Sequence, residues 1–336
     1  MLPWSSPSLT VVAFLLTYYV SRRFKKRLLG RTPPGPKGWP IIGNVSDIPH
    51  SKSWLTYMDW RKIYGDIVYV EPFGNPTVIL NNLEDIRELL DKRSAITASR
   101  PRMVMANELM GWGWDFVHMP HDDLWRQRRK VFHQYFQQKN ITTYYPTIRK
   151  STASLLSQLA ESPGRFRDHI RQLAAGIILK LTYDHQVTSE DDYYVLLAHK
   201  ALEGLLQAVH VGSFVVDVIP ALAFIPAWFP GASFKRKARR NAKYSTELRD
   251  VPFLQAKKRK DAEAIEPCLV SEGLERDGAN EEVVKDAAGI AYLAGSDTAL
   301  QTVSVIEFFF VAMLHYPEVQ ARAREEIDYI RKKLEV

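Results

Sequence analysis

Residues 281–316 read EEVVKDAAGIAYLAGSDTALQTVSVIEFFFVAMLHY, and this segment decides the fold because it predicts one uninterrupted helix. Asn280 can cap its first turn, Glu281 and Glu282 favour the positive end of the helix dipole, and the next proline is Pro317. A helix of 36 residues is roughly 54 Å long, which is enough to cross a whole domain. Its middle is apolar on nearly all faces, so we expect a buried core helix.

The centre of this helix, residues 294–299, reads AGSDTA and breaks two local rules. Gly295 costs about 1 kcal/mol relative to alanine in a helix interior, and the Asp297 carboxylate is unfavourable in a buried stretch unless it is paired or neutralised. One interpretation is a face on which a planar cofactor lies, with Asp297 and Thr298 handling protons beside it. The alternative is helix packing, with Asp297 satisfied by a neighbouring arginine. Four small residues recur at helical spacing: Ala291, Gly295, Thr298 and Thr302.

Residues 122–136, DDLWRQRRKVFHQYF, form a second candidate constellation. On a helix Trp125 and Arg129 are separated by four positions, so the indole N–H and the guanidinium project from one face. Both groups donate hydrogen bonds, and arginine binds a carboxylate bidentately. The pair therefore suits a buried or ligand-borne carboxylate, whereas the alternative is a solvated basic helix.

Composition excludes several classes of protein. A chain of 336 residues with 46% hydrophobic residues can bury a core, so intrinsic disorder is excluded. The single cysteine, Cys268, forms no internal disulfide or cysteine-rich metal site, and His118 and His121 lack a third ligand pattern, so we predict no metal centre. The net charge of +7 is concentrated in three runs, residues 22–31, 235–240 and 257–260, so we expect no nucleic-acid partner.

The N-terminus has the pattern of a membrane anchor. Residues 1–21 contain no charged side chain, and the basic residues follow this apolar stretch, which predicts a single span with the rest of the chain in the cytoplasm. The alternative is an ordinary buried N-terminal helix. Residues 22–52 hold the basic stop and a proline-rich stretch that we interpret as a stiff hinge, and residues 53–336 form the globular part.

The globular part is predicted to be mainly α-helical with a small N-terminal β-sheet. Apolar spacing predicts a helix over residues 54–64, and two β-branched runs separated by PFGNP predict a hairpin. Residues 101–124 are expected to form a long loop rich in aromatic residues. The two strands of the hairpin are residues 67–71 and 77–80, and further helices are predicted over residues 83–92, 124–169, 170–185, 193–211 and 231–266.

Taken in order, these segments resemble the cytochrome P-450 superfamily, particularly its membrane-bound fungal members. Residues 33–44, PPGPKGWPIIGN, are similar to the family's proline-rich hinge, and WRQRR stands in place of its W-x-x-x-R helix. AGSDTA matches the pattern [AG]-G-x-[DE]-T-[TS], with Ala299 replacing the last hydroxyl, and residues 315–328 resemble the helix that follows. The resemblance covers essentially the whole chain.

The resemblance implies a haem-dependent monooxygenase that inserts one oxygen atom of O2 into an apolar substrate. It implies haem b as cofactor, a propionate bound by Trp125 and Arg129, a porphyrin over Ala294 and Gly295, and proton delivery by Asp297 and Thr298. It also implies an NADPH-dependent reductase as electron donor, an endoplasmic reticulum membrane location, and a lipid-contacting loop at residues 220–231. The residues expected to face substrate are Met103, Met105, Leu109, Met110, Trp112, Trp114 and Phe116.

The chain departs from the family pattern at its C-terminus. It stops before the family's F-x-x-G-x-R-x-C-x-G loop, whose cysteine thiolate is the axial ligand of iron, and we interpret it as C-terminally truncated. The context of Cys268 lacks that glycine and arginine pattern, so it is not expected to substitute. The alternative function is therefore a non-catalytic, membrane-anchored product that binds no haem.

Overall fold

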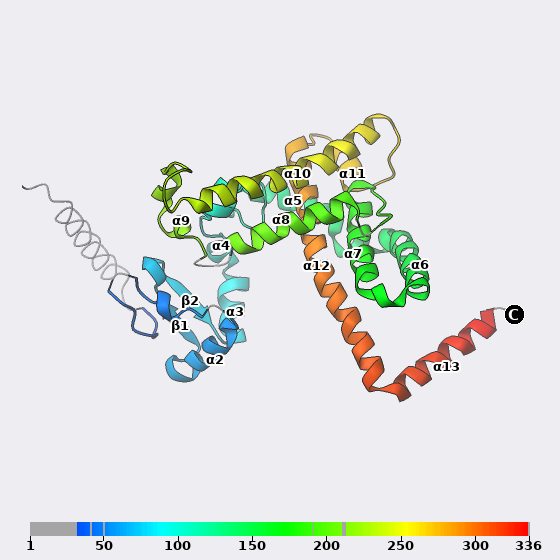
Figure 1. Ribbon diagram of the computed structural model, residues 1–336, viewed down its shortest axis with the longest axis horizontal. Helices are drawn as coiled ribbons and strands as arrows, with labels where there is room; N and C mark the ends of the chain where they lie inside the picture. Colours follow the sequence, from blue (N-terminus) through cyan, green and yellow to red (C-terminus); the bar gives the residue numbers. More distant parts are fainter. Residues whose placement is uncertain (1–31, 41, 50, 190, 210–212, 335–336) are drawn as a thin grey trace, which may run out of the picture. The chain divides into compact units, whose positions relative to one another are not determined.

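The structure is a computed structural model that describes residues 32–40, 42–49, 51–189, 191–209 and 213–334. It is mainly helical with one small antiparallel sheet, as the sequence predicted, and it divides into two compact units, Met1–Ser99 and Arg100–Val336 (Figure 1). The predicted anchor and basic stop, residues 1–31, lie outside the described residues. Among the helices that are described, none combines the length and the apolar character needed to cross a membrane.

The first unit is built on a two-stranded hairpin. Strand β1 (Ile67–Val70) pairs antiparallel with β2 (Thr77–Leu80), which confirms the predicted hairpin. Val68 and Val70 are buried while Ile67 and Tyr69 are only partly buried, the alternation of a half-covered strand. The α- and π-helical segments of this unit are α2 (Ser53–Tyr64), α3 (Leu83–Ile86), the π-helical Arg87–Lys92 and α4 (Ser94–Thr97), and Val45–Asp47 and Pro72–Gly74 form 3₁₀ turns.

The proline-rich stretch belongs to this unit, whereas the sequence predicted only a spacer. The Tyr69 amide donates a hydrogen bond of 2.9 Å to the carbonyl oxygen of Pro34, so the stretch lies along β1. A Cβ at Gly35 would lie 1.9 Å from the carbonyl oxygen of Tyr69, so only glycine permits this approach. Proline lacks an N–H but keeps its carbonyl acceptor, which is why the stretch can still bond to the sheet.

The second unit is a set of helices joined by short 3₁₀ and π-helical turns. The predicted continuous helical pattern over residues 124–169 is interrupted twice, at Gln138–Tyr144 and at Pro163–Arg165. Part of the predicted loop over residues 101–124 is π-helical, at Val104–Leu109. The α-helices are α5 (Asp123–Phe136), α6 (Tyr145–Glu161), α7 (Phe166–Tyr183), α8 (Tyr193–Val209), α9 (Val215–Val218), α10 (Ser233–Asp261), α11 (Leu269–Glu275), α12 (Glu281–His315) and α13 (Pro317–Leu334).

Helix α12 is the central helix of the second unit. It packs against α5, α7, α8, α10 and α11, and the Asn280 side chain caps it by accepting from the amides of Glu282 and Val283. The first half is buried, as predicted, with Ala288 and Tyr292 fully covered. The second half keeps one side against the start of α7, where the Phe310 and Phe166 rings lie 5.4 Å apart, but Phe308 is 74% and Leu314 is 80% exposed. The prediction of a buried core helix is therefore right for the first half and wrong for the second.

Candidate functional site

The centre of α12 is packed against α7 at the glycine that the sequence singled out. A Cβ built on Gly295 would lie 2.4, 2.8 and 3.0 Å from the Cγ1, Cβ and Cγ2 atoms of Ile178. These separations are well below an ordinary carbon contact of about 3.5 to 4.0 Å. Ile178 of α7 therefore fills the space expected to be open, and Gly295 allows the two helices to approach closely.

The prediction of an open notch at Gly295 is wrong because a β-branched side chain of another helix occupies it. The cofactor role of Ala294 and Gly295 stays a prediction. Asp297 and Thr298 belong to α12, but their side chains fall outside the described part of the structure. Their predicted proton-handling role is likewise untested.

Helix α5 carries the predicted carboxylate-binding pair on a partly solvated face. Trp125 is half-buried, and its ring lies edge-on to His121 with the ring centroids 4.4 Å apart. Arg129 is exposed, with its guanidinium carbon 5.6 Å from the centre of the Phe132 ring, and it forms no ion pair with a carboxylate of the described residues. Asp122 caps this helix by accepting from the Trp125 amide at 2.9 Å. The Arg129 guanidinium is thus available to an external carboxylate.

Arg128, which precedes Arg129 on α5, takes part in a buried ion-pair cluster that the sequence did not reveal. Asp286 of α12 is fully buried, and its Oδ2 accepts from Arg128 Nε at 2.7 Å, while its Oδ1 accepts from Arg249 Nε of α10 at 2.6 Å. Arg249 also bonds to Glu282, and Lys285 Nζ lies 2.6 Å from Glu282 Oε1. The cluster fixes α5, α10 and α12 to one another.

Burial and charge oppose each other within this cluster. Burial raises the pKa of the Asp286 carboxyl, and the guanidiniums of Arg249 and Arg128 counteract this effect. Burial alone would lower the pKa of Arg249, but Asp286 and Glu282 raise it above its ordinary value. The sequence held only a weak signal, since Asp286 follows Lys285 and Glu282 closely and stands at the start of the apolar stretch, and its partners Arg128 and Arg249 lie far away in the chain.

The residues expected to face substrate are brought together in the core of the second unit. Met105, Met110 and Trp112 are at most 1% exposed, and Trp114 and Phe116 are also buried. Met103 and Leu109 pack against the same cluster. The indole N–H of Trp114 donates to Ser245 Oγ of α10 at 3.1 Å, and a Cβ at Gly289 of α12 would lie 2.8 Å from the Trp114 ring.

Packing against α10 and α12 accounts for this burial, because aromatic and methionine side chains fill cores as readily as they line ligand pockets. The substrate-facing role of these seven residues stays a prediction.

The single thiol is a helix cap in the core. Cys268 is fully buried at the N-terminus of α11, where the Ser271 amide lies 3.5 Å from its Sγ atom and the Ser271 hydroxyl accepts from the Cys268 amide. Burial raises the pKa of the Cys268 thiol, which opposes formation of a thiolate. His118 lies 2.6 Å from Asp115 Oδ2, and the described residues contain no group of three candidate metal ligands.

The apolar loop over residues 220–231 lies on the surface of the second unit. It contains the 3₁₀ turn Pro220–Phe224 and then reaches the start of α10. Phe224 is 89% exposed and Trp228 is 79% exposed, so the loop presents large apolar side chains to the surroundings. Such side chains next to lysines and arginines are typical of segments that adsorb to membranes.

Comparisons with known proteins place the chain in a family. The family model for cytochrome P450 matches residues 33–335. The chain belongs to the cytochrome P450 family. It is 37% identical over 306 residues to cytochrome P450 monooxygenase COX2 of Coprinopsis cinerea, covering 89% of this chain and 58% of that protein.

Two other fungal P450 relatives give the same picture. The chain is 38% identical over 323 residues to cytochrome P450 monooxygenase ple1 of Rhodocybe pseudopiperita, covering 94% of this chain and 61% of the relative. It is 35% identical over 325 residues to the tryptamine 4-monooxygenase of Psilocybe cyanescens, covering 94% of this chain and 63% of that protein. The chain therefore spans about three fifths of the length of these P450 relatives.

The described residues meet part of what the P450 family's haem cofactor requires. The Trp125 and Arg129 donors on α5 fit a haem propionate, since Arg129 has no described carboxylate partner. The space beside Gly295 does not fit the face of a macrocycle, because Ile178 fills it. The fit is thus at the edge of the cofactor and not at the predicted notch.

Proposed function

We propose that this chain acts in haem-dependent monooxygenation of an apolar organic substrate. One oxygen atom of O2 enters the substrate, and the other leaves as water after uptake of two protons and two electrons. The observation that carries the proposal is the match to the cytochrome P450 family over residues 33–335. The fungal relatives named as monooxygenases support the same reaction class.

Within this proposal the predicted residues of α5, of the segment at 103–116 and of the Asp297–Thr298 pair have physical roles. The Trp125 indole and the Arg129 guanidinium hold a propionate at the edge of α5. When bound, haem iron supplies the redox chemistry that activates dioxygen. Asp297 and Thr298 of α12 supply a carboxylate and a hydroxyl that pass protons into an apolar surrounding. The methionine and aromatic residues of the segment at 103–116 favour a substrate with little polar surface.

The proposed partners follow from the reaction and from the charge pattern. The electrons come from an NADPH-dependent reductase, which is the donor that the family resemblance implies. We place the protein at the endoplasmic reticulum membrane, with residues 1–21 as anchor and the folded units in the cytoplasm. The basic residues at 22–31 support this orientation, and the exposed Phe224 and Trp228 support a second contact with lipid.

A second candidate function is a membrane-anchored protein that binds no haem and catalyses no reaction. Two observations favour it. Ile178 occupies the space beside Gly295, and the chain's one thiol, Cys268, is a buried helix cap whose pKa burial raises. Neither arrangement offers a thiolate or an open face to a macrocycle.

Haem binding to the purified full chain separates the two functions. Haemin is titrated into the wild-type chain, an Arg129→Gln variant and a Lys130→Gln variant, and the Soret absorbance is followed. Lys130 is the matched control because it is also exposed and loses the same charge on the same helix. We expect Arg129→Gln to weaken haem binding about tenfold, because a hydrogen bond to a charged group contributes about that much to affinity. Lys130→Gln should leave haem binding unchanged.

Equal affinities for the two variants would refute the propionate role of Arg129. If none of the three proteins binds haem, the non-catalytic function is supported instead. Reduction under carbon monoxide adds a second readout, since a thiolate ligand shifts the Soret band to the red. We expect no such shift, and Cys268→Ala should therefore leave the spectrum unchanged.

A further inference from the structure

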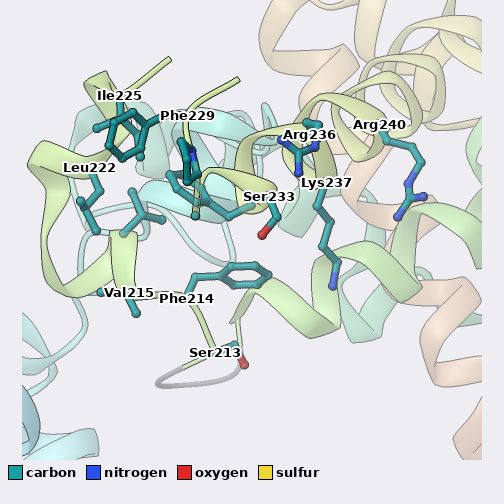
Figure 2. Close-up of a pocket in the computed structure, with 14 residues that line it drawn as sticks. Ser213, Phe214, Val215, Leu222, Ile225, Phe229, Ser233, Arg236, Lys237 and Arg240 are labelled. Carbon is teal, nitrogen blue, oxygen red and sulfur yellow. The ribbon is translucent and has the colours of Figure 1, made fainter. Parts of the chain in front are cut away.

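The second unit has a cavity of about 830 Å³ where the apolar loop over residues 220–231 meets the start of α10. Figure 2 shows its two sides. Leu222, Ile225 and Phe229 lie on one side, and three basic residues of α10 lie on the other. Of the 14 residues that line it, those three are cations and none is an acid, so the cavity has an uncompensated positive charge. The basic residues are Arg236, Lys237 and Arg240.

Two neighbouring cations hold the loop in place. Lys235 Nζ donates to the carbonyl oxygen of Ile225 at 2.8 Å, and Arg236 Nη1 donates to that of Ala227 at 2.9 Å. These bonds tie the loop to the first turn of α10 and so set the shape of the cavity. Arg236 is therefore a structural residue of the cavity as well as a source of charge.

The other two cations remain for a ligand. Lys237 and Arg240 are three positions apart on α10, so their side chains leave the same side of the helix. Lys237 Nζ lies 5.4 Å from the centre of the Phe214 ring, and neither residue forms an ion pair with a carboxylate of the described residues. Two unpaired cations beside an apolar wall suit a ligand with an anionic head and an aliphatic tail.

The surroundings favour a ligand that sits in a bilayer. Phe224 and Trp228 project from the same loop and are 89% and 79% exposed. Tryptophan at the edge of an apolar surface prefers the membrane–water interface, and basic residues at that depth attract anionic lipid. A nucleic acid would instead need a longer basic track with stacked aromatic rings.

We propose that this cavity binds the headgroup of an anionic glycerophospholipid within a bilayer. Lys237 and Arg240 contact the headgroup oxygens, and Leu222, Ile225 and Phe229 contact the first part of an acyl chain. The inference rests on the membrane partner proposed above, but it does not depend on haem or on turnover. It assigns the lipid preference to one cavity and not to the total charge of the chain.

Vesicle binding of the full-length chain tests the site. Binding is measured by flotation with vesicles of phosphatidylcholine alone and of phosphatidylcholine with phosphatidylserine. The test variant is Lys237→Gln/Arg240→Gln, and the matched control is Arg239→Gln/Lys258→Gln, which removes the same charge from exposed positions of α10 that do not line the cavity. The N-terminal segment is common to all versions, so its contribution cancels in the comparison.

We expect the test variant to lose about tenfold more affinity for the phosphatidylserine vesicles than the control does, with both unchanged on phosphatidylcholine. A second variant, Ser233→Trp, fills the cavity without altering charge. General adsorption would gain from an added tryptophan, so weaker binding by Ser233→Trp specifically supports the cavity. Circular dichroism shows whether each variant keeps the helical content of the wild type.

Other outcomes overturn the inference in distinguishable ways. Equal losses in the test and control variants would show diffuse charge attraction with no site, leaving the membrane partner intact. Absence of binding to every vesicle by the wild type would remove the membrane partner as well. Binding of soluble laurate or of a single-stranded oligonucleotide with the same variant dependence, but no preference for anionic vesicles, would assign the cavity to a different ligand.

Discussion

Replacement of Gly295 by alanine tests the packing of α12 against α7 directly. The added Cβ would lie 2.4 Å from Cγ1 and 2.8 Å from Cβ of Ile178. The β-branched side chain is stiff at χ1, and its Cβ cannot move without the backbone, so the helices must separate by roughly 1 Å to reach an ordinary contact. Overpacking of this kind costs about 1 to 3 kcal/mol.

Helix propensity acts in the opposite direction. Alanine is favoured over glycine by about 1 kcal/mol in a helix interior, so we expect Gly295→Ala to lower the free energy of unfolding by about 1 kcal/mol overall. In an Ile178→Gly background all three contacting atoms are removed and the clash is absent, so the same replacement should raise the free energy of unfolding by about 1 kcal/mol. The coupling between the two positions is then about 2 kcal/mol, which exceeds the usual error in additivity of about 0.5 kcal/mol.

Urea unfolding followed by circular dichroism measures all four proteins of this cycle. Gly176→Ala is the matched control, because Gly176 lies inside α7 and its nearest neighbour to an added Cβ, Val187, is at 3.8 Å. Gly176→Ala should raise the free energy of unfolding by about 1 kcal/mol. If Gly295→Ala stabilises the chain like Gly176→Ala and is insensitive to Ile178, then Ile178 does not fill the notch and the reasoning fails.

Three further predictions concern stability and reactivity. Asp286→Ala leaves two partly buried guanidiniums without their partner and should lower the free energy of unfolding by about 3 to 5 kcal/mol, as measured by denaturant titration. Cys268 should react with Ellman's reagent at neutral pH only after unfolding, and its raised pKa means that stability falls as pH rises through the ordinary thiol range. Gly35→Ala should break the hydrogen bond that the Tyr69 amide donates to the Pro34 carbonyl oxygen and speed the hydrogen exchange of that amide, because the new Cβ meets the carbonyl oxygen of Tyr69.

Each of these predictions has a result that contradicts it. A loss below about 1 kcal/mol for Asp286→Ala would show that the ion pairs are no stronger than surface pairs. Rapid modification of Cys268 in the folded chain would mean that the thiol is accessible. If Cys268→Ser keeps the same decline of stability with pH, another group is responsible. Unchanged exchange of the Tyr69 amide in Gly35→Ala would place the proline-rich stretch away from β1.

The sequence predicted helices and strands well where residues at their own ends determine where they begin and stop. The limits of α12 follow from Asn280, whose side chain accepts from two amides, and from Pro317, whose ring cannot continue a helix. The hairpin followed from β-branched runs around a turn. The breaks at Gln138–Tyr144 and Pro163–Arg165 were missed although the sequence marks them, the first by a mostly polar run and the second by the turn-forming pair Pro163 and Gly164.

Long-range pairing was not predictable in the same way. Arg128 and Asp286 are 158 positions apart, and the spacing of neither helix indicates which cation meets the acid. The sequence directed attention to Arg129, one position further along α5, because its spacing from Trp125 suits a ligand. Consecutive residues of a helix point about 100° apart, so Arg128 reaches α12 while Arg129 remains exposed.

The Gly295 position shows why residue type alone did not determine the site. A glycine in a long apolar helix relieves a steric conflict, but the sequence does not say whether the approaching group is a ring of a cofactor or a side chain of another helix. Ile178 lies in a helix that the sequence also predicted, yet nothing in the spacing of either segment set their relative rotation. The structure assigns the notch to Ile178. A haem face at this helix therefore depends on displacement of α7 or on other faces of α12, and the coupling between Gly295 and Ile178 measures how strongly the packed arrangement resists that change.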